Sequence, residues 1–73
     1  MEDTEAEVYQ YMLEYQRHVG EPPTMRQIMH NVDGLNYRSS VRFALLNLEE
    51  MGLVEQVKPP LMSRRWKAIN NRR

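Results

Sequence analysis

Residues 41–57, VRFALLNLEEMGLVEQV, contain a predicted helix, a helix stop and a predicted strand in direct succession. On a helical wheel of about 100° per residue, one arc of this helix is apolar and is expected to face a core. The residues of that arc are Val41, Ala44, Leu45, Leu48 and Met51. Gly52 is expected to end the helix, because glycine readily adopts the left-handed backbone of helix C-termini. Leu53–Val57 is then predicted to be a strand.

A first helix is predicted over residues 4–18, ahead of this stretch. Thr4 and Glu7 have the spacing of a capping box, in which each side chain satisfies a free backbone N–H at the helix start. Gly20 is the expected residue after the helix end. Its apolar side chains recur at the helical period and predict one buried face: Val8, Tyr11, Met12, Tyr15 and Val19.

A short second helix is predicted after Glu21-Pro22-Pro23, since a residue that precedes proline avoids the α conformation. Thr24 and Gln27 form a second capping box at its start. The apolar face of this helix comprises Ile28, Met29 and Val32. Asn31, Asp33 and Gly34 are expected to end it in a turn.

Arg65–Ile69 is predicted to be a second strand that pairs with Leu53–Val57. Pro59 and Pro60 exclude a tight two-residue turn between the strands, so a long loop is expected. The order of helix, short helix, turn, helix and hairpin is that of a winged helix-turn-helix, an α+β, mainly α fold with a two-stranded β-hairpin wing. We expect one such domain over residues 1–70 and a frayed basic tail at 71–73.

The chain has 73 residues, no cysteine and a net charge of zero, but its charges are unevenly distributed. Residues 1–21 carry a net charge of −5, and residues 22–73 carry +5. Such asymmetry is typical of proteins with an anionic partner such as nucleic acid, although a basic segment can also be merely solvated. The longest apolar run is Ala44–Leu46, too short for a membrane span. Because cysteine is absent, a reducing compartment is expected. The protein is therefore predicted to be cytoplasmic, and nucleoid-associated when bound to DNA.

No enzymatic site is expected. Nucleophilic catalysis needs a base and an orienting group, and the chain has no cysteine and only two scattered histidines, His18 and His30. These histidines lack the partners of a zinc site. The three glycines are widely separated and form no phosphate-binding loop. We therefore expect no catalytic residue, metal, cofactor or small-molecule substrate.

Several motifs resemble the DNA-binding domain of LexA-type repressors. The most specific is Gly20-x-Pro22-Pro23-Thr24, followed at a fixed distance by Gly52-Leu53-Val54-Glu55. The similarity covers roughly residues 5–69. It implies a third helix in the major groove and a wing on the backbone or minor groove of double-stranded DNA. The similarity does not extend to the self-cleaving dimerisation domain of that family, so neither of that domain's activities is expected.

The positions that align with the base-reading residues of the family differ from it, so its operator sequence is not carried over. A recognition helix places its N-terminal residues at base edges. The expected recognition-helix contacts are Tyr37, Arg38, Ser39, Ser40, Arg42 and Phe43. Arg42 suits bidentate contact with guanine, and Phe43 suits a thymine methyl group. The expected backbone and wing contacts are Thr24, Arg26, Lys58, Arg64, Arg65 and Lys67.

A second hypothesis is a protein-interaction module. Phe43 and Leu46 are expected on the outer face of the third helix, where two large apolar side chains suggest a contact surface. A protein partner or a homodimer therefore remains an alternative to DNA. Trp66 is expected to pack the hairpin against the helices, with nucleic-acid stacking as the alternative.

Overall fold

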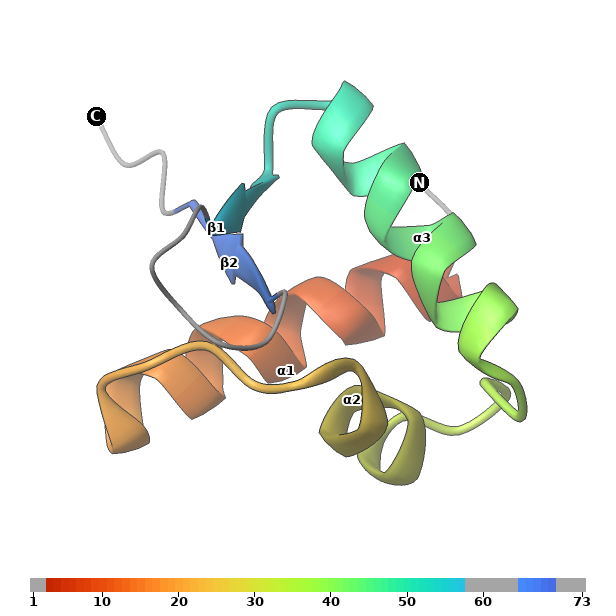
Figure 1. Cartoon of the computed structure of the whole chain (residues 1–73), viewed down its shortest axis with the longest axis horizontal. Coiled ribbons are helices and arrows are strands. Elements are labelled where there is room, and N and C mark those ends of the chain that lie inside the picture. Colours follow the sequence, from red (N-terminus) through yellow and green to blue (C-terminus); the bar gives the residue numbers. More distant parts are fainter. Residues whose placement is uncertain (1–2, 58–64, 70–73) are drawn as a thin grey trace.

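The structure is a computed structural model, and it describes residues 3–57 and 65–69 (Figure 1). This part of the chain forms three helices, α1 (Asp3–Val19), α2 (Met25–Asn31) and α3 (Arg38–Glu50). The two strands β1 (Val54–Val57) and β2 (Arg65–Ala68) follow. The predicted α+β, mainly α winged helix-turn-helix layout is confirmed. The predicted loop over 58–64 and the basic tail over 71–73 lie outside the described residues.

The core lies where the three helices meet the hairpin. The buried face predicted for α3 is confirmed at four positions, since Val41, Ala44, Leu45 and Leu48 are all buried. These side chains set the rotation of α3 about its axis and thereby decide which residues face outward. The rest of the buried apolar cluster comes from every other element: Val8, Met12, Ile28, Val32, Leu35, Val54, Trp66 and Ala68.

Two residues assigned to the core by their helical spacing are exposed instead. Met51 is 45% exposed and Val19 is 52% exposed. Val19 is the last residue of α1, where the helix has already passed the core. Met51 is the C-cap residue of α3, beyond the last full helical residue. In both cases the apolar spacing of the sequence continues to the end of the helix, but no neighbouring element covers the helix there.

The start of α1 also differs from the prediction. The helix begins at Asp3, so Thr4 lies within the first turn and is not the N-cap. The capping box of α2, by contrast, is confirmed. The backbone N–H of Gln27 donates to Thr24 Oγ1 at 3.1 Å, and the backbone N–H of Thr24 donates to Gln27 Oε1 at 2.8 Å.

A Schellman turn connects α3 to the hairpin. The N–H of Leu53 donates to the carbonyl of Leu48 at 2.9 Å, and the N–H of Gly52 donates to the carbonyl of Glu49 at 2.9 Å. Gly52 has a φ of +78°, as this motif requires. β1 then pairs with β2 in antiparallel register, with Val54 opposite Ala68 and Glu55 opposite Lys67. The N–H of Ile69 extends the pairing through a 2.7 Å bond to the carbonyl of Leu53.

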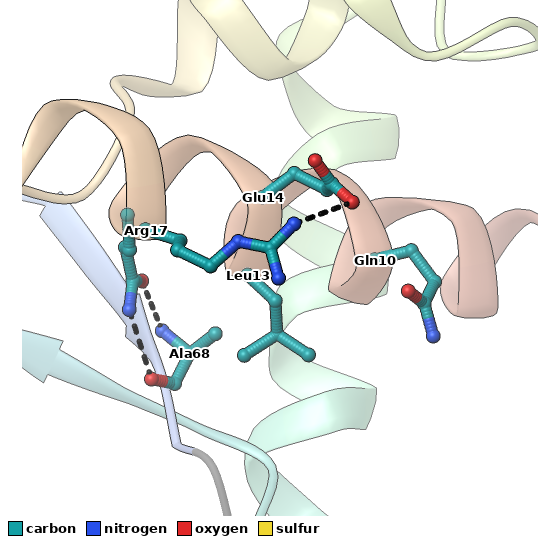
Figure 2. Close-up of a pocket in the computed structure, with 6 residues that line it drawn as sticks. Gln10, Leu13, Glu14, Arg17 and Ala68 are labelled. Atoms are coloured by element: carbon teal, nitrogen blue, oxygen red, sulfur yellow. Dashed lines mark hydrogen bonds and ion pairs between the residues drawn. The ribbon is translucent and has the colours of Figure 1, made fainter.

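The hairpin is fastened to α1 by side-chain hydrogen bonds. Gln16 Oε1 accepts from the N–H of Ala68 at 2.6 Å, while Gln16 Nε2 donates to the carbonyl of Ala68 at 3.2 Å (Figure 2). The hydroxyl of Tyr9 donates to the carbonyl of Ile69 at 2.7 Å. Gln16 thus pairs with the outer edge of β2 much as a neighbouring strand would.

Among the described residues, no helix has the length and apolar character needed to cross a membrane.

Candidate nucleic-acid interface

The outer face of α3 carries most of the predicted recognition residues. Arg38, Ser39, Arg42 and Phe43 are exposed, whereas Ser40 is half-buried. Because the opposite face of α3 is packed into the core, these side chains project from the molecule together. In Figure 1, α3 runs along one side of the fold, with α1 and the hairpin on its inner side.

The N-terminal end of α3 favours an anionic ligand. Tyr37 is the N-cap, but its side chain makes no capping hydrogen bond and is 70% exposed. Its carbonyl accepts from the N–H groups of Ser40 and Val41, at 3.1 and 3.3 Å. No acidic residue lies in the first turn, where Arg38 adds a positive charge to the positive end of the helix dipole. Phosphate would be favoured at this end.

The charge of α3 changes sign along its length. Arg38 and Arg42 lie in the N-terminal half, and Glu49 and Glu50 lie in the last turn. All four side chains are exposed. Within residues 3–57 and 65–69, none of the four takes part in an ion pair. The N-terminal half of α3 is therefore the part that suits a polyanion.

The start of α2 supplies the other predicted phosphate contacts. Arg26 is exposed, and Thr24 is half-buried. The capping box already uses Thr24 Oγ1 as an acceptor and satisfies the N–H of Gln27. The hydroxyl proton of Thr24 can still donate to a phosphate oxygen. Thr24 is thus a weaker phosphate contact than the sequence suggests, while the phosphate contact expected of the exposed Arg26 stays a prediction.

Two tyrosines of α1 position α2, although their helical spacing predicted only a place in the core. Tyr15 Oη accepts from Gln27 Nε2 at 3.1 Å, and Tyr11 Oη accepts from Asn31 Nδ2 at 3.3 Å. The two rings are 5.9 Å apart and tilted by 47°. Burial, together with the neighbouring Tyr15, raises the pKa of Tyr11 above its ordinary value. These contacts fix α2 against α1, and α2 in turn contacts α3.

The described part of the wing carries fewer available cations than predicted. Lys67 Nζ lies 3.6 Å from Glu55 Oε2, on the opposite strand, so part of its charge is neutralised. Trp66 is only 6% exposed and packs in the core, as predicted, so it offers no stacking surface to a base. Lys58, Arg64 and the side chain of Arg65 lie outside the described residues.

The hollow shown in Figure 2 lies between α1 and Ala68 of β2. It has a volume of about 400 Å³ and is lined by Gln10, Leu13, Glu14, Gln16, Arg17 and Ala68. Most of its polar groups bind one another: Arg17 Nη2 lies 3.4 Å from Glu14 Oε2, and Gln16 binds Ala68. The hollow therefore marks the contact between α1 and the hairpin and presents no convergent polar groups to a ligand.

Comparisons of the chain with protein-family models, with curated proteins and with solved structures found no match. Within the described residues, no group of three or more histidine, aspartate or glutamate side chains could hold a metal ion.

Proposed function

We propose that this protein is a sequence-specific regulator of transcription, acting as a repressor, that binds double-stranded DNA. In this proposal α3 enters the major groove, and the hairpin wing lies on the backbone or in the minor groove. The observation that carries it is the outward projection of Arg38, Ser39 and Arg42 from the N-terminal half of a helix whose other face is buried. The resemblance to LexA-type repressors supports the same docking.

The dimensions of α3 suit this role. An α-helix with its side chains is about 10–12 Å across, and the major groove is about 12 Å wide. Arg42 lies one turn into α3, where a bidentate contact with guanine O6 and N7 contributes about 1–3 kcal/mol of discrimination. Ser39 can contact a base edge, and Arg38 can contact a phosphate at the helix start.

The charge pattern favours entry by the N-terminal half of α3. Glu49 and Glu50, at the other end, would be repelled by phosphates if the helix lay fully along the groove. A tilted helix, with its N-terminus in the groove and its C-terminus outside, avoids this repulsion. In this docking, Arg26 of α2 would contact the DNA backbone, as the first helix of a helix-turn-helix does.

Selection from a randomised pool of short duplexes at about 50 mM salt would test the proposal. An enriched motif is the expected result, and a salt titration of that motif should give log K against log[salt] a slope near −5 for about six neutralised phosphates. Uniform weak recovery with a steep slope would mean backbone binding without sequence reading. Absence of duplex binding at micromolar protein would overturn the proposal.

A protein-interaction module is the second candidate function. It is favoured by Phe43, which is 69% exposed, and by Leu46, which is 38% exposed one turn further along α3. Large apolar side chains on a surface helix are typical of contact sites. Phe43→Ser would abolish capture of a protein partner in this hypothesis, whereas Arg38→Ala would weaken binding only if the partner were DNA. The pair of variants separates the two functions.

A further inference from the structure

The exposed face of α3 is divided into three parts along the helix. The N-terminal part is basic (Arg38 and Arg42), and the C-terminal part is acidic (Glu49 and Glu50). Between them, in the middle third of the helix, lie two exposed apolar side chains, Phe43 and Leu46. We call this whole surface the α3 face.

The α3 face is complementary to itself when the helix is turned end for end. Arg42, Leu46 and Glu50 are spaced four residues apart, so they form one of the ridges by which helices pack together. Rotation by 180° about an axis through Leu46 exchanges the positions of Arg42 and Glu50. A two-fold contact of this kind forms the pair of Arg42 and Glu50 twice.

We propose that two copies of this chain pair through the α3 face in antiparallel orientation, with Leu46 near the two-fold axis. Arg42 of each copy lies beside Glu50 of the other. Phe43 of each copy packs beside Leu46 of the other copy, and its side chain is thereby buried away from water. The proposal goes beyond DNA binding and does not depend on it, because it rests on the apolar and charged residues of one exposed helix face.

Charge complementarity favours a second copy over another kind of partner. The α3 face carries two cations and two anions, and a uniformly basic or acidic protein would meet like charge at one end. A second copy meets opposite charge at both ends. Because a single helix from each copy makes the contact, the interface belongs to the small, transient class of less than about 1,200 Å².

The pairing has a consequence for the proposed function. It covers Arg42 and Phe43, which are the residues proposed to read bases. A dimer of this kind cannot place α3 in the major groove, so dimerisation and DNA binding exclude each other. The protein would then limit its own DNA-binding form as its concentration rises, since mass action favours the dimer.

Sedimentation velocity of the full chain over about 10 μM to 1 mM, without DNA, tests the pairing. We expect concentration-dependent dimers. Arg42→Glu places two pairs of like charges in the interface and should raise the dissociation constant about tenfold or more. Leu46→Glu should do the same by placing two charges near the axis. The double variant Arg42→Glu/Glu50→Arg restores opposite charges and should restore dimers, which no general effect on folding would produce.

Two control variants carry the same chemical changes elsewhere. Arg26→Glu reverses an exposed arginine of α2, and Val19→Glu introduces a glutamate at the exposed end of α1. Both should leave the dimer unchanged. Circular dichroism of every variant verifies the fold. A protein that stays monomeric throughout the range would overturn the proposal. So would dimers that withstand both Arg42→Glu and Leu46→Glu, because they would use another surface.

A DNA arm separates this proposal from the proposed function. The duplex recovered by selection should dissociate the wild-type dimer, because both need the α3 face. Arg26→Glu should weaken DNA binding and keep the dimer, whereas Arg42→Glu/Glu50→Arg should keep the dimer and lose specific DNA binding. Dimers without any DNA binding would overturn only the DNA function. A duplex that binds the intact dimer would overturn the antiparallel pairing through α3.

Discussion

Asn47 of α3 donates a 2.6 Å hydrogen bond from Nδ2 to Oε2 of Glu5 in α1, across 42 residues of sequence. Glu5 is 8% exposed, and among the described residues it is the one charged residue that is buried. Because a buried carboxyl group without a partner is costly, this bond helps to set how α3 sits on α1. The orientation of the α3 face therefore depends in part on a residue at the start of the first helix.

Asn47→Ala should destabilise the fold, because it leaves the buried carboxyl group of Glu5 without its hydrogen bond. A loss of about 1–3 kcal/mol in the free energy of unfolding is expected. Urea denaturation measures it. Glu5→Gln keeps an acceptor oxygen for Asn47 and should cost less. Equal losses for the two variants would show that the bond contributes nothing specific.

Gln16→Ala should loosen the hairpin, since both backbone groups of Ala68 lose their side-chain partner. The expected loss is about 1–2 kcal/mol for two partly exposed hydrogen bonds. Amide exchange at Ala68 should accelerate more than exchange in α2. Gln10→Ala, on the same helix and beside the same hollow, is the control and should leave exchange at Ala68 unchanged.

Gly52→Ala should lower the free energy of unfolding by about 1–2 kcal/mol, the usual cost of a left-handed backbone with a side chain. A Cβ at this position would meet nothing within 4 Å, so the cost comes from the φ of +78° and not from a clash. Thermal denaturation measures it. Gly52→Asn should cost less, because asparagine tolerates this conformation. An alanine variant as stable as the wild type would contradict the left-handed backbone assigned to Gly52.

The stability of the fold should fall as pH rises above the ordinary tyrosine pKa of 10.0. The pKa of Tyr11 is raised in the folded state by burial and by Tyr15, so the unfolded chain loses this proton first. The contribution of protonated Tyr11 to the free energy of unfolding is therefore complete below pH 10.0. It is lost as pH rises through the pKa of Tyr11 in the folded state.

Tyr11→Phe isolates this contribution. Asn31 Nδ2 keeps its 2.8 Å bond to the carbonyl of Gln27, so the variant should fold. Urea denaturation of both proteins between about pH 8.5 and 11 should give a shallower decline for the variant, because it has one fewer titrating tyrosine. Parallel declines would show that Tyr11 titrates alike in the folded and unfolded states.

Arg42→Ala and Arg38→Ala should affect DNA binding differently. Arg42→Ala should cost about 1–3 kcal/mol on the selected sequence and relax the preference at one base pair. Arg38→Ala should weaken binding to all sequences and reduce the salt slope by about 1. Fluorescence anisotropy on the selected duplex and a scrambled duplex measures both effects. Arg17→Ala, on the exposed surface of α1, is the control and should leave both affinities unchanged.

Local sequence signals predicted the elements well. The capping box of Thr24 and Gln27, the stop at Gly52 and the apolar face from Val41 to Leu48 depend only on neighbours within one or two helical turns. The prediction failed at Val19 and Met51 for the same reason. A helical period says which residues share a face, but it does not say where along the helix a covering element ends.

The amino-acid sequence by itself determined the order of the elements, the inner face of α3 and hence the set of residues that face outward. Only the tertiary structure decided what holds α3 and the hairpin in place. The bond between Glu5 and Asn47 and the pairing of Gln16 with Ala68 join residues 42 and 52 positions apart. Polar contacts at such separation leave no periodic pattern in the chain, because they arise only once hydrophobic packing has brought distant helices and strands together.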